Sequence, residues 1–451
     1  MTLDLRKFVR ATNPANTLFV DDREEDHKYY IDFSSVRGGQ IISRILDNIA
    51  LWSPDERTCQ LFTGHIGCGK STELLRLKEQ LEQEGFHVIY FESSQDLEMG
   101  DVDVGDILLA IARRVSQSLD AIQIEKKPTK LQSILQGAEK LLNMDIEISG
   151  EFKTPVGTLA ANTDGEISLD MGIANIAAKA KGSPEVRSKL RGYLEPRTNG
   201  IIEAINTELL EPGIQKLKDI GKQGLVVIVD NLDKVDSSPK AWGRPQQEYL
   251  FVDRGEQLRS IDCHVVYTIP LALRFSNDFS TLTQRFMTTP EVLPMVSVKL
   301  RDGSEHVEGM YLLRQMVLAR GFPDLEPEQR LENIGDIFDS PETLDRLCRA
   351  SGGHVRNLLR LLNEAIKKER GLPISRENLE AVIRAYRNER ILAVDEQEWI
   401  LLKKVAQQKK VAGDEGYQTL IRSMFVYEYR DEEGSWFDIN PILAESDRFS
   451  D

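Results

Sequence analysis

A glycine-rich stretch near the start of the chain carries the residues best suited to bind phosphate. The letters GHIGCGKS at 64–71 follow a short apolar run and open into an apolar-periodic segment. Glycines let the backbone curl so that its N–H groups point at phosphate oxygens, and the following helix adds its positive end. Lys70 is predicted to reach the β- and γ-phosphates, and the Ser71 hydroxyl to ligate Mg²⁺. The alternative is a glycine turn before an ordinary helix, but the strand-loop-helix context favours nucleotide contacts from Gly64, His65, Ile66, Gly67, Cys68, Gly69, Lys70, Ser71 and Thr72.

A second candidate site follows the apolar run at 224–229. Five consecutive apolar residues there indicate a strand buried on both faces, and the chain then continues as Asp230-Asn231-Leu232-Asp233. Open α/β sheets bind ligands at the carboxyl ends of their strands. Asp230 is therefore predicted to hold Mg²⁺ through water, with Asp233 or Asn231 facing the attacking water. The alternative is a strand that simply ends in an Asp-Asn turn.

Four further polar residues are candidates for acting on a bound phosphate. Thr268 ends the apolar run 264–268, where it would sense the γ-phosphate or merely cap the strand. Arg274 and Arg285 are candidates for an arginine that reaches a neighbouring subunit's nucleotide, and are otherwise surface arginines. Arg356 follows a glycine pair inside the first turn of a predicted helix, where it either aims a cation into a cleft or lies on a solvated face.

Length, charge and cysteine content limit the class of protein. At 451 residues the chain has room for two or three domains with a large core. The net charge of −16 means that attraction to nucleic acid or anionic membrane is not built into the bulk of the protein. The cysteines are scattered, the histidines lack metal-ligand spacing, and neither a signal peptide nor a membrane-spanning window is found. We therefore expect a cytoplasmic protein with no membrane partner.

Alternating strand and helix patterns predict the fold class. Apolar runs at 87–91, 225–229 and 264–268 read as buried strands, with a further strand expected at 292–300, and helical spacing separates them. This alternation predicts a doubly wound α/β core with a mostly parallel sheet. The expected parts are an amino-terminal lead-in, the core, a helical lid and a winged-helix-like unit, at 1–35, 36–302, 303–392 and 393–451.

The section 121–200 departs from the alternation of the core. Residues 130–142 look helical, whereas 145–152 and 165–171 alternate between polar and apolar residues in the manner of strands. These segments predict an inserted hairpin. It is either a flexible surface insertion or a functional loop that contacts a pore or a partner.

The last unit has two predicted helices followed by a hairpin that turns at Gly434, an arrangement typical of a winged helix. The tip of the hairpin is acidic, and acidic residues outnumber basic ones across the unit. A wing that reads DNA would need the opposite charge. The sequence therefore favours a winged helix that contacts protein over one that binds DNA.

Taken together, these motifs resemble those of the AAA+ and STAND-type P-loop ATPases. Within these ATPases, they resemble the bacterial and archaeal members that have an origin-recognition-like lid and a winged helix. The resemblance rests on GHIGCGKS at 64–71, VVIVDNLD at 226–233 and SGGHVR at 351–356. It implies a sensor role for Thr268 and for Arg356. It also implies an arginine finger at Arg285 and adenine-side contacts at Val36 and Arg37. AAA+ hydrolases usually place Glu where this chain has Asn231, so slow or partner-dependent hydrolysis is expected, with Asp233 matching STAND-like relatives.

Three functions are compatible with these residues. The first is a switch that binds and hydrolyses ATP with Mg²⁺ and whose nucleotide state controls its conformation, its assembly with copies of itself and its contact with a protein partner. The second is an ATP-dependent, nucleic-acid-binding initiator or loader. The third is a scaffold that binds ATP without hydrolysing it, which Asn231 would explain.

Overall fold

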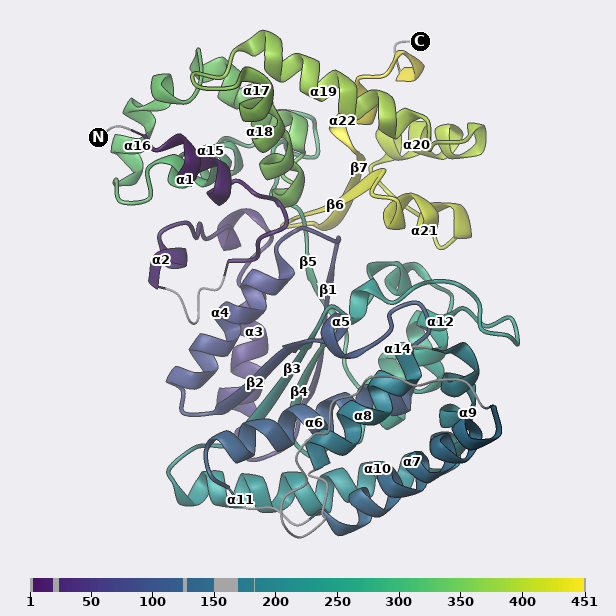
Figure 1. Ribbon diagram of the computed structural model, residues 1–451. Coiled ribbons are helices and arrows are strands. Elements are labelled where there is room, and N and C mark those ends of the chain that lie inside the picture. Colours follow the sequence, from purple (N-terminus) through teal and green to yellow (C-terminus); the bar gives the residue numbers. More distant parts are fainter. Residues whose placement is uncertain (1–2, 19–23, 125–127, 150–168, 182, 450–451) are drawn as a thin grey trace.

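The computed structural model of the chain describes residues 3–18, 24–124, 128–149, 169–181 and 183–449. Figure 1 shows a sheet in the middle, long helices across one of its faces, and a helical region beyond one end of its strands that contains both ends of the chain. No helix among the described residues combines the length and the apolar character needed to cross a membrane.

The central sheet has five strands in the order β2-β3-β4-β1-β5, and every pairing is parallel. The strands are β1 (Cys59–Gly64), β2 (His87–Glu92), β3 (Leu225–Asp230), β4 (His264–Thr268) and β5 (Glu291–Leu293). The predicted parallel α/β core is confirmed. The expected strand at 292–300 is shorter, because after Leu293 the backbone turns to another partner: the Met295 N–H donates to the Glu428 carbonyl at 2.9 Å.

Helices cover both faces of the sheet, which explains why residues 225–229 of β3 are all apolar. Val226 and Ile228 pack in one buried cluster with α3 (Ile41–Asp47) and α4 (Lys70–Gln83). The alternating residues Val227 and Val229 pack in another, with α6 (Val104–Ala121). A strand covered on both faces needs apolar residues at every position. Four shorter helices also belong to the α/β core: α5 (Ser93–Asp96), α12 (Gln246–Glu248), α13 (Gly255–Arg259) and α14 (Phe279–Phe286).

The section between α6 and β3 is helical, and the predicted hairpin is wrong where the structure describes it. Its helices are α7 (Thr129–Ser149), α8 (Leu169–Lys181), α9 (Pro184–Leu194), α10 (Thr198–Ala204) and α11 (Glu211–Asp219). Leu131, Leu135, Ala138 and Leu142 are all buried, and their three- and four-residue spacing carries the helix through the short alternating stretch. The remaining part of that prediction, 150–168, lies outside the described residues.

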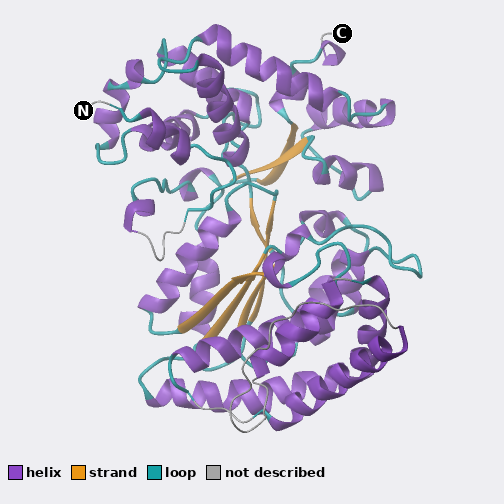
Figure 2. Cartoon of the chain, viewed as in Figure 1, coloured by secondary structure: helices purple, strands orange, loops and turns teal. Residues whose placement is uncertain are grey.

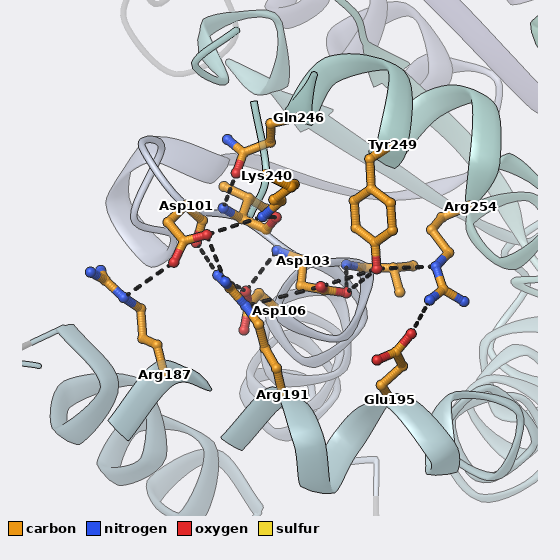
Figure 3. Close-up of polar contacts among 12 residues, drawn as sticks. Asp101, Asp103, Asp106, Arg187, Arg191, Glu195, Lys240, Gln246, Tyr249 and Arg254 are labelled. Atoms are coloured by element: carbon orange, nitrogen blue, oxygen red, sulfur yellow. Dashed lines mark hydrogen bonds and ion pairs between the residues drawn. The ribbon is translucent and has the colours of Figure 1, made fainter. Parts of the chain in front are cut away.

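A polar network fastens these helices to the core (Figure 3). Arg191 of α9 donates to Asp101 at 2.6 Å. Lys240, in the loop that follows β3, donates to the same carboxylate at 3.0 Å and to the Val102 carbonyl at 2.8 Å. One carboxylate thus joins the inserted helices to the loop after the second candidate site. The described part of the insertion is therefore anchored to the core, unlike the flexible insertion considered above.

The helical region beyond the sheet also includes the amino-terminal segment. Its main helices are α15 (Val307–Gly321), α16 (Pro327–Glu332), α17 (Pro341–Ser351), α18 (Val355–Glu369) and α19 (Arg376–Ile391), joined by α1 (Leu5–Ala11) and α2 (Glu24–His27). Phe8 of α1 is buried in the core of this region. The Asn363 amide of α18 donates to the Val9 carbonyl at 3.0 Å. The amino-terminal segment thus becomes part of the wall above the sheet.

The last unit contains two helices followed by an antiparallel hairpin, as predicted. Its elements are α20 (Glu396–Gln408), α21 (Glu415–Arg422), β6 (Val426–Asp431), β7 (Gly434–Ile439) and α22 (Pro441–Ala444). Figure 2 shows this hairpin lying next to the upper end of the central sheet. Tyr427, Tyr429 and Trp436 are buried. The acidic tip is also engaged, because Arg301 donates to Asp431 at 2.8 Å.

Candidate nucleotide-binding site

The glycine-rich loop connects β1 to α4 and has the backbone geometry that its sequence requires. Gly67 and Gly69 have φ angles of 86° and 107°, in the left-handed region that glycine tolerates best. A Cβ added at Gly67 would lie 2.9 Å from the Cβ of Arg356 and 2.9 Å from the Cε1 of His354. The α18 end of the helical region therefore lies directly on the loop. The Arg356 N–H donates to the Gly67 carbonyl at 3.1 Å.

Lys70 lies inside the loop and contacts three oxygens. Its ammonium donates to the carbonyls of Gly64 at 2.8 Å and His65 at 2.9 Å. It also forms a buried ion pair with Asp233 at 2.9 Å. Burial alone would lower the pKa of Lys70, but the charge of Asp233 and further interactions outweigh it, so the pKa is raised. The ammonium stays charged, and a phosphate entering the loop would compete with Asp233 for it.

Asp230 and Ser71 lie together beside the loop, as a shared metal site requires. Ser71 and Asp230 line the same cavity, and the Ser71 hydroxyl acts to lower the pKa of the Asp230 carboxyl. The Tyr90 hydroxyl donates to the same carboxylate at 2.8 Å. Burial, and then the nearby charge of Asp233, raises the pKa of Asp230. A cation bound here would stabilise the ionised form of this carboxylate.

Asp233 and Asn231 differ in what they present to the site. Asp233 uses one oxygen for Lys70, while its buried Oδ1 has no hydrogen-bond partner. Asn231 adopts a left-handed φ of 65°, and its side-chain amide donates to the Ser94 hydroxyl at 3.3 Å. An amide does not take up a proton at neutral pH. Asp233 is therefore the group that can accept a hydrogen bond or a proton from a water molecule.

These residues line one polar cavity of about 210 Å³. Its floor is the loop and α4, one wall is the end of β3, and the opposite walls are the segment 14–17 and α18. Arg356 is exposed and lines this cavity. No pattern in the sequence indicates that the segment 14–17 lines the cavity. The contact of Tyr90 with Asp230 follows from the pairing of β2 with β3, which the sequence does not specify.

A second cavity of about 80 Å³ adjoins the first. The two share five lining residues: Asn16, Gly69, Thr72, Val355 and Leu359. The second is lined by side chains from the segment 29–33 and by Met316 and Arg320 of α15. A mostly apolar cavity next to a phosphate loop suits the base of a nucleotide.

The two residues predicted to lie on the adenine side differ in where their side chains lie. Arg37 lines this second cavity, and its Nη2 donates to the Cys68 carbonyl of the loop at 2.8 Å. Val36 instead packs in the core of the helical region. The structure corrects the expected nucleotide contact of Val36, because its side chain is directed into that core.

Thr268 is fully buried and contacts backbone rather than the cavity. Its hydroxyl accepts from the Leu232 N–H at 3.0 Å and lies 3.4 Å from the Val229 carbonyl. The expected γ-phosphate contact of Thr268 is therefore corrected to the capping alternative. The side chain holds the turn that carries Asp233.

The two arginines considered for a neighbouring subunit differ in how they are held. Arg274 is paired within the chain with Glu428 of β6 and donates to the Ser435 hydroxyl at 3.4 Å. Arg285, at the end of α14, is 37% exposed and lies 2.9 Å from Glu256 in an ion pair. Arg285 thus remains accessible at the surface, whereas Arg274 connects the core to the last unit.

The P-loop also contacts the last unit through His65. The Glu428 N–H donates to His65 Nε2 at 3.0 Å. His354 at the start of α18 contacts the Ile66 carbonyl through Nε2 at 2.8 Å, and its ring stacks on Tyr427. Burial lowers the pKa of His65 to about 3 and that of His354 to about 4. Both rings are therefore neutral at physiological pH and join the loop to the helical region and the hairpin.

The residues present fit a magnesium ion held jointly with a ligand. No group of three or more His, Cys, Asp or Glu residues suited to a metal is found among the described residues. Mg²⁺ commonly uses one or two protein ligands, several waters and the phosphates of its substrate. Ser71 and Asp230 would supply the protein ligands.

No protein-family model and no curated protein matches this chain. Several solved structures resemble it. One is the ORC2 protein of Aeropyrum pernix in ADPNP–ADP complexes, with 13% identity and a TM-score of 0.39 over 96% of this chain and 94% of that chain. Others are Cdc6p of Pyrobaculum aerophilum, with 12% identity and a TM-score of 0.37 over 98% of this chain and 96% of that chain, and Drosophila ORC bound to DNA, with 11% identity and a TM-score of 0.35 over 98% of this chain and 91% of that chain. All three are named as origin-recognition or Cdc6 proteins. Likeness at this level assigns no role to any residue of this chain, so its function must be inferred from the geometry above.

Proposed function

We propose that this chain is an ATPase switch that binds ATP with Mg²⁺ between the parallel sheet and the helical region. The observation that carries the proposal is the convergence of Lys70, Ser71, Asp230, Asp233 and Arg356 on one polar cavity at the carboxyl ends of β1 and β3. In this site Lys70 binds the β- and γ-phosphates, and Arg356 meets the γ-phosphate from α18. Bound Mg²⁺, held by Ser71 and through water by Asp230, neutralises charge that develops on the phosphates.

Hydrolysis in this proposal depends on Asp233. The Lys70 ammonium leaves Asp233 for the phosphates, which frees the carboxylate to orient the attacking water. Asn231 has its amide on Ser94 and no basic group to offer. In this proposal the catalytic base becomes available only when nucleotide binds.

The contacts around the loop support a change of conformation with nucleotide. A nucleotide that moves Lys70 disturbs the His65 carbonyl, and the ring of the same residue holds the hairpin at Glu428. Arg356 responds to the γ-phosphate on the other side of the loop. We infer that the nucleotide sets the position of the helical region and of the hairpin, and thereby controls assembly with further copies, for which Arg285 is the candidate arginine.

Binding and turnover test this function directly. Titrate ATP·Mg²⁺ and measure phosphate release for wild type, Lys70→Ala and Asp233→Asn. The matched control is Lys78→Ala, on the same helix, where Lys78 pairs with Glu82 at 3.4 Å. Loss of binding in Lys70→Ala but not in Lys78→Ala is expected. Equal ATP affinity in Lys70→Ala and wild type would remove the proposal.

The alternative function, a nucleic-acid-binding initiator or loader, is tested by DNA binding. The face of the hairpin packs on the loop region and its acidic tip binds Arg301, which supports contact with protein rather than with DNA. A gel shift with duplex DNA and ATP should show no affinity that falls steeply with salt. Native mass measured with and without ATP, for wild type and Arg285→Ala, tests the assembly step.

A further inference from the structure

Arg320 of α15 is a buried arginine whose guanidinium has no hydrogen-bonded partner. It is only 7% exposed, and its Nε is a buried donor without an acceptor. No hydrogen bond or ion pair joins this guanidinium to any residue within the described ranges. Its recorded neighbour is the ring of Tyr29, whose centroid lies 5.2 Å from the guanidinium carbon.

Arg330, a second buried arginine of the helical region, shows how an arginine with a structural role is held. Arg330 is 8% exposed. Its Nε donates to the Phe322 carbonyl at 3.2 Å and its Nη2 to the Pro323 carbonyl at 3.3 Å. Burying a charged donor without an acceptor is costly, so such groups usually have a partner. Arg320 therefore lacks an acceptor that Arg330 has.

Burial has a measurable effect on Arg320. It lowers the pKa of the guanidinium to about 10, although Tyr29 and Asp26 act in the opposite direction. The group remains charged at neutral pH. Arg320 lines the second cavity, which shares Gly69 and Thr72 with the phosphate site. Arg320 thus lines the space beside the P-loop where the base of a nucleotide would lie.

We propose that Arg320 is a specificity-determining residue that reads the base of the bound nucleotide by donating a hydrogen bond to a ring nitrogen of the purine. This inference rests on the proposed ATP site and adds a group that contacts the base. Arginine has donors and no acceptor. It therefore favours a base edge that presents an unprotonated ring nitrogen, and Tyr29 packs against the guanidinium and limits how it can turn.

Deaza analogues of ATP test this contact because each replaces one ring nitrogen by a C–H group. Titrate wild type, Arg320→Met, Arg320→Lys and the control Arg330→Met with ATP, 1-deaza-ATP, 3-deaza-ATP and 7-deaza-ATP. Wild type should bind one analogue about tenfold or more weakly than ATP, as expected for loss of a charged hydrogen bond. That analogue identifies the nitrogen. Arg320→Met should bind ATP and the same analogue equally, and Arg320→Lys, which keeps the charge, should discriminate less than wild type.

The control separates base reading from folding. Arg330→Met should lower the thermal midpoint and leave the ratio of affinities unchanged. Arg320→Met should raise the midpoint without nucleotide, because it removes a buried charge that has no acceptor. Equal binding of ATP and all three analogues by wild type would overturn the inference, as would discrimination that persists in Arg320→Met. If ATP affinity does not depend on Lys70, the proposed function fails; if it does and the analogue series is flat, only the role of Arg320 fails.

Discussion

The buried ion pair between Lys70 and Asp233 gives the sharpest energetic prediction. Both side chains are almost inaccessible, at 6% and 4% exposed, and the charged atoms lie 2.9 Å apart. Removing one partner of such a pair costs about 3–5 kcal/mol because the other charge stays buried. We expect Lys70→Met to fall in this range. Asp233→Asn should cost less, since Lys70 keeps its bonds to the carbonyls of Gly64 and His65.

The double variant should cost less than the sum of the two single variants, with a coupling of about 1.5–3 kcal/mol. For a core of this size about 1 kcal/mol corresponds to roughly 2 °C in the thermal midpoint. Lys70→Met alone should therefore lower the midpoint by about 6–10 °C. The assay is differential scanning fluorimetry without nucleotide on wild type, both single variants and the double variant. Effects that add to within about 0.5 kcal/mol would refute the buried pair.

Three more predictions follow from the contacts around the loop. Gly67→Ala should weaken ATP binding by more than about tenfold, because its Cβ would meet Arg356 and His354 at 2.9 Å and the residue has a positive φ. Isothermal titration calorimetry measures this change. An unchanged ATP affinity would contradict the close packing of α18 on the loop. Arg356→Ala should weaken the binding of ATP more than that of ADP. Equal losses of affinity for the two nucleotides would refute a contact between Arg356 and the γ-phosphate. His65, with a pKa of about 3 in the folded protein against 6.5 unfolded, stays neutral in the fold while the unfolded chain takes up its proton. The stabilising effect of the neutral ring is therefore complete above about pH 6.5 and is lost as the pH falls towards 3. The thermal midpoint should fall less between pH 7 and 5 in His65→Gln than in wild type. Equal falls of the midpoint in the two proteins would contradict the buried neutral ring.

Local signals in the sequence were enough to predict the phosphate loop and the strands of the core. The loop needs glycine at fixed positions, and a strand covered on both faces needs an unbroken apolar run such as 225–229. The two helices and the hairpin of the last unit were also predicted, because their periodicities are strong. Only two of these signals, the loop and the end of β3, pointed to the site itself.

Other features depend on packing between distant segments and carry no local signal. Where the structure describes it, at 145–149, the short alternation was outweighed by the helical spacing of the residues before it. Thr268 and Val36 were assigned by position along the chain, whereas their side chains are directed into backbone and core contacts. The hydrogen bond from Glu428 to His65 joins residues 363 positions apart, which no pattern in the sequence indicates.

The central claim is that one cavity binds the triphosphate between the P-loop and the acidic end of β3. The most direct test is an experimental structure with Mg²⁺ and a non-hydrolysable ATP analogue. We expect the phosphates on the amides of 67–72, the Lys70 ammonium moved from Asp233 to the phosphates, and the metal at Ser71 near Asp230. An analogue bound elsewhere, or a triphosphate in the loop with the Lys70–Asp233 pair intact, would contradict the account.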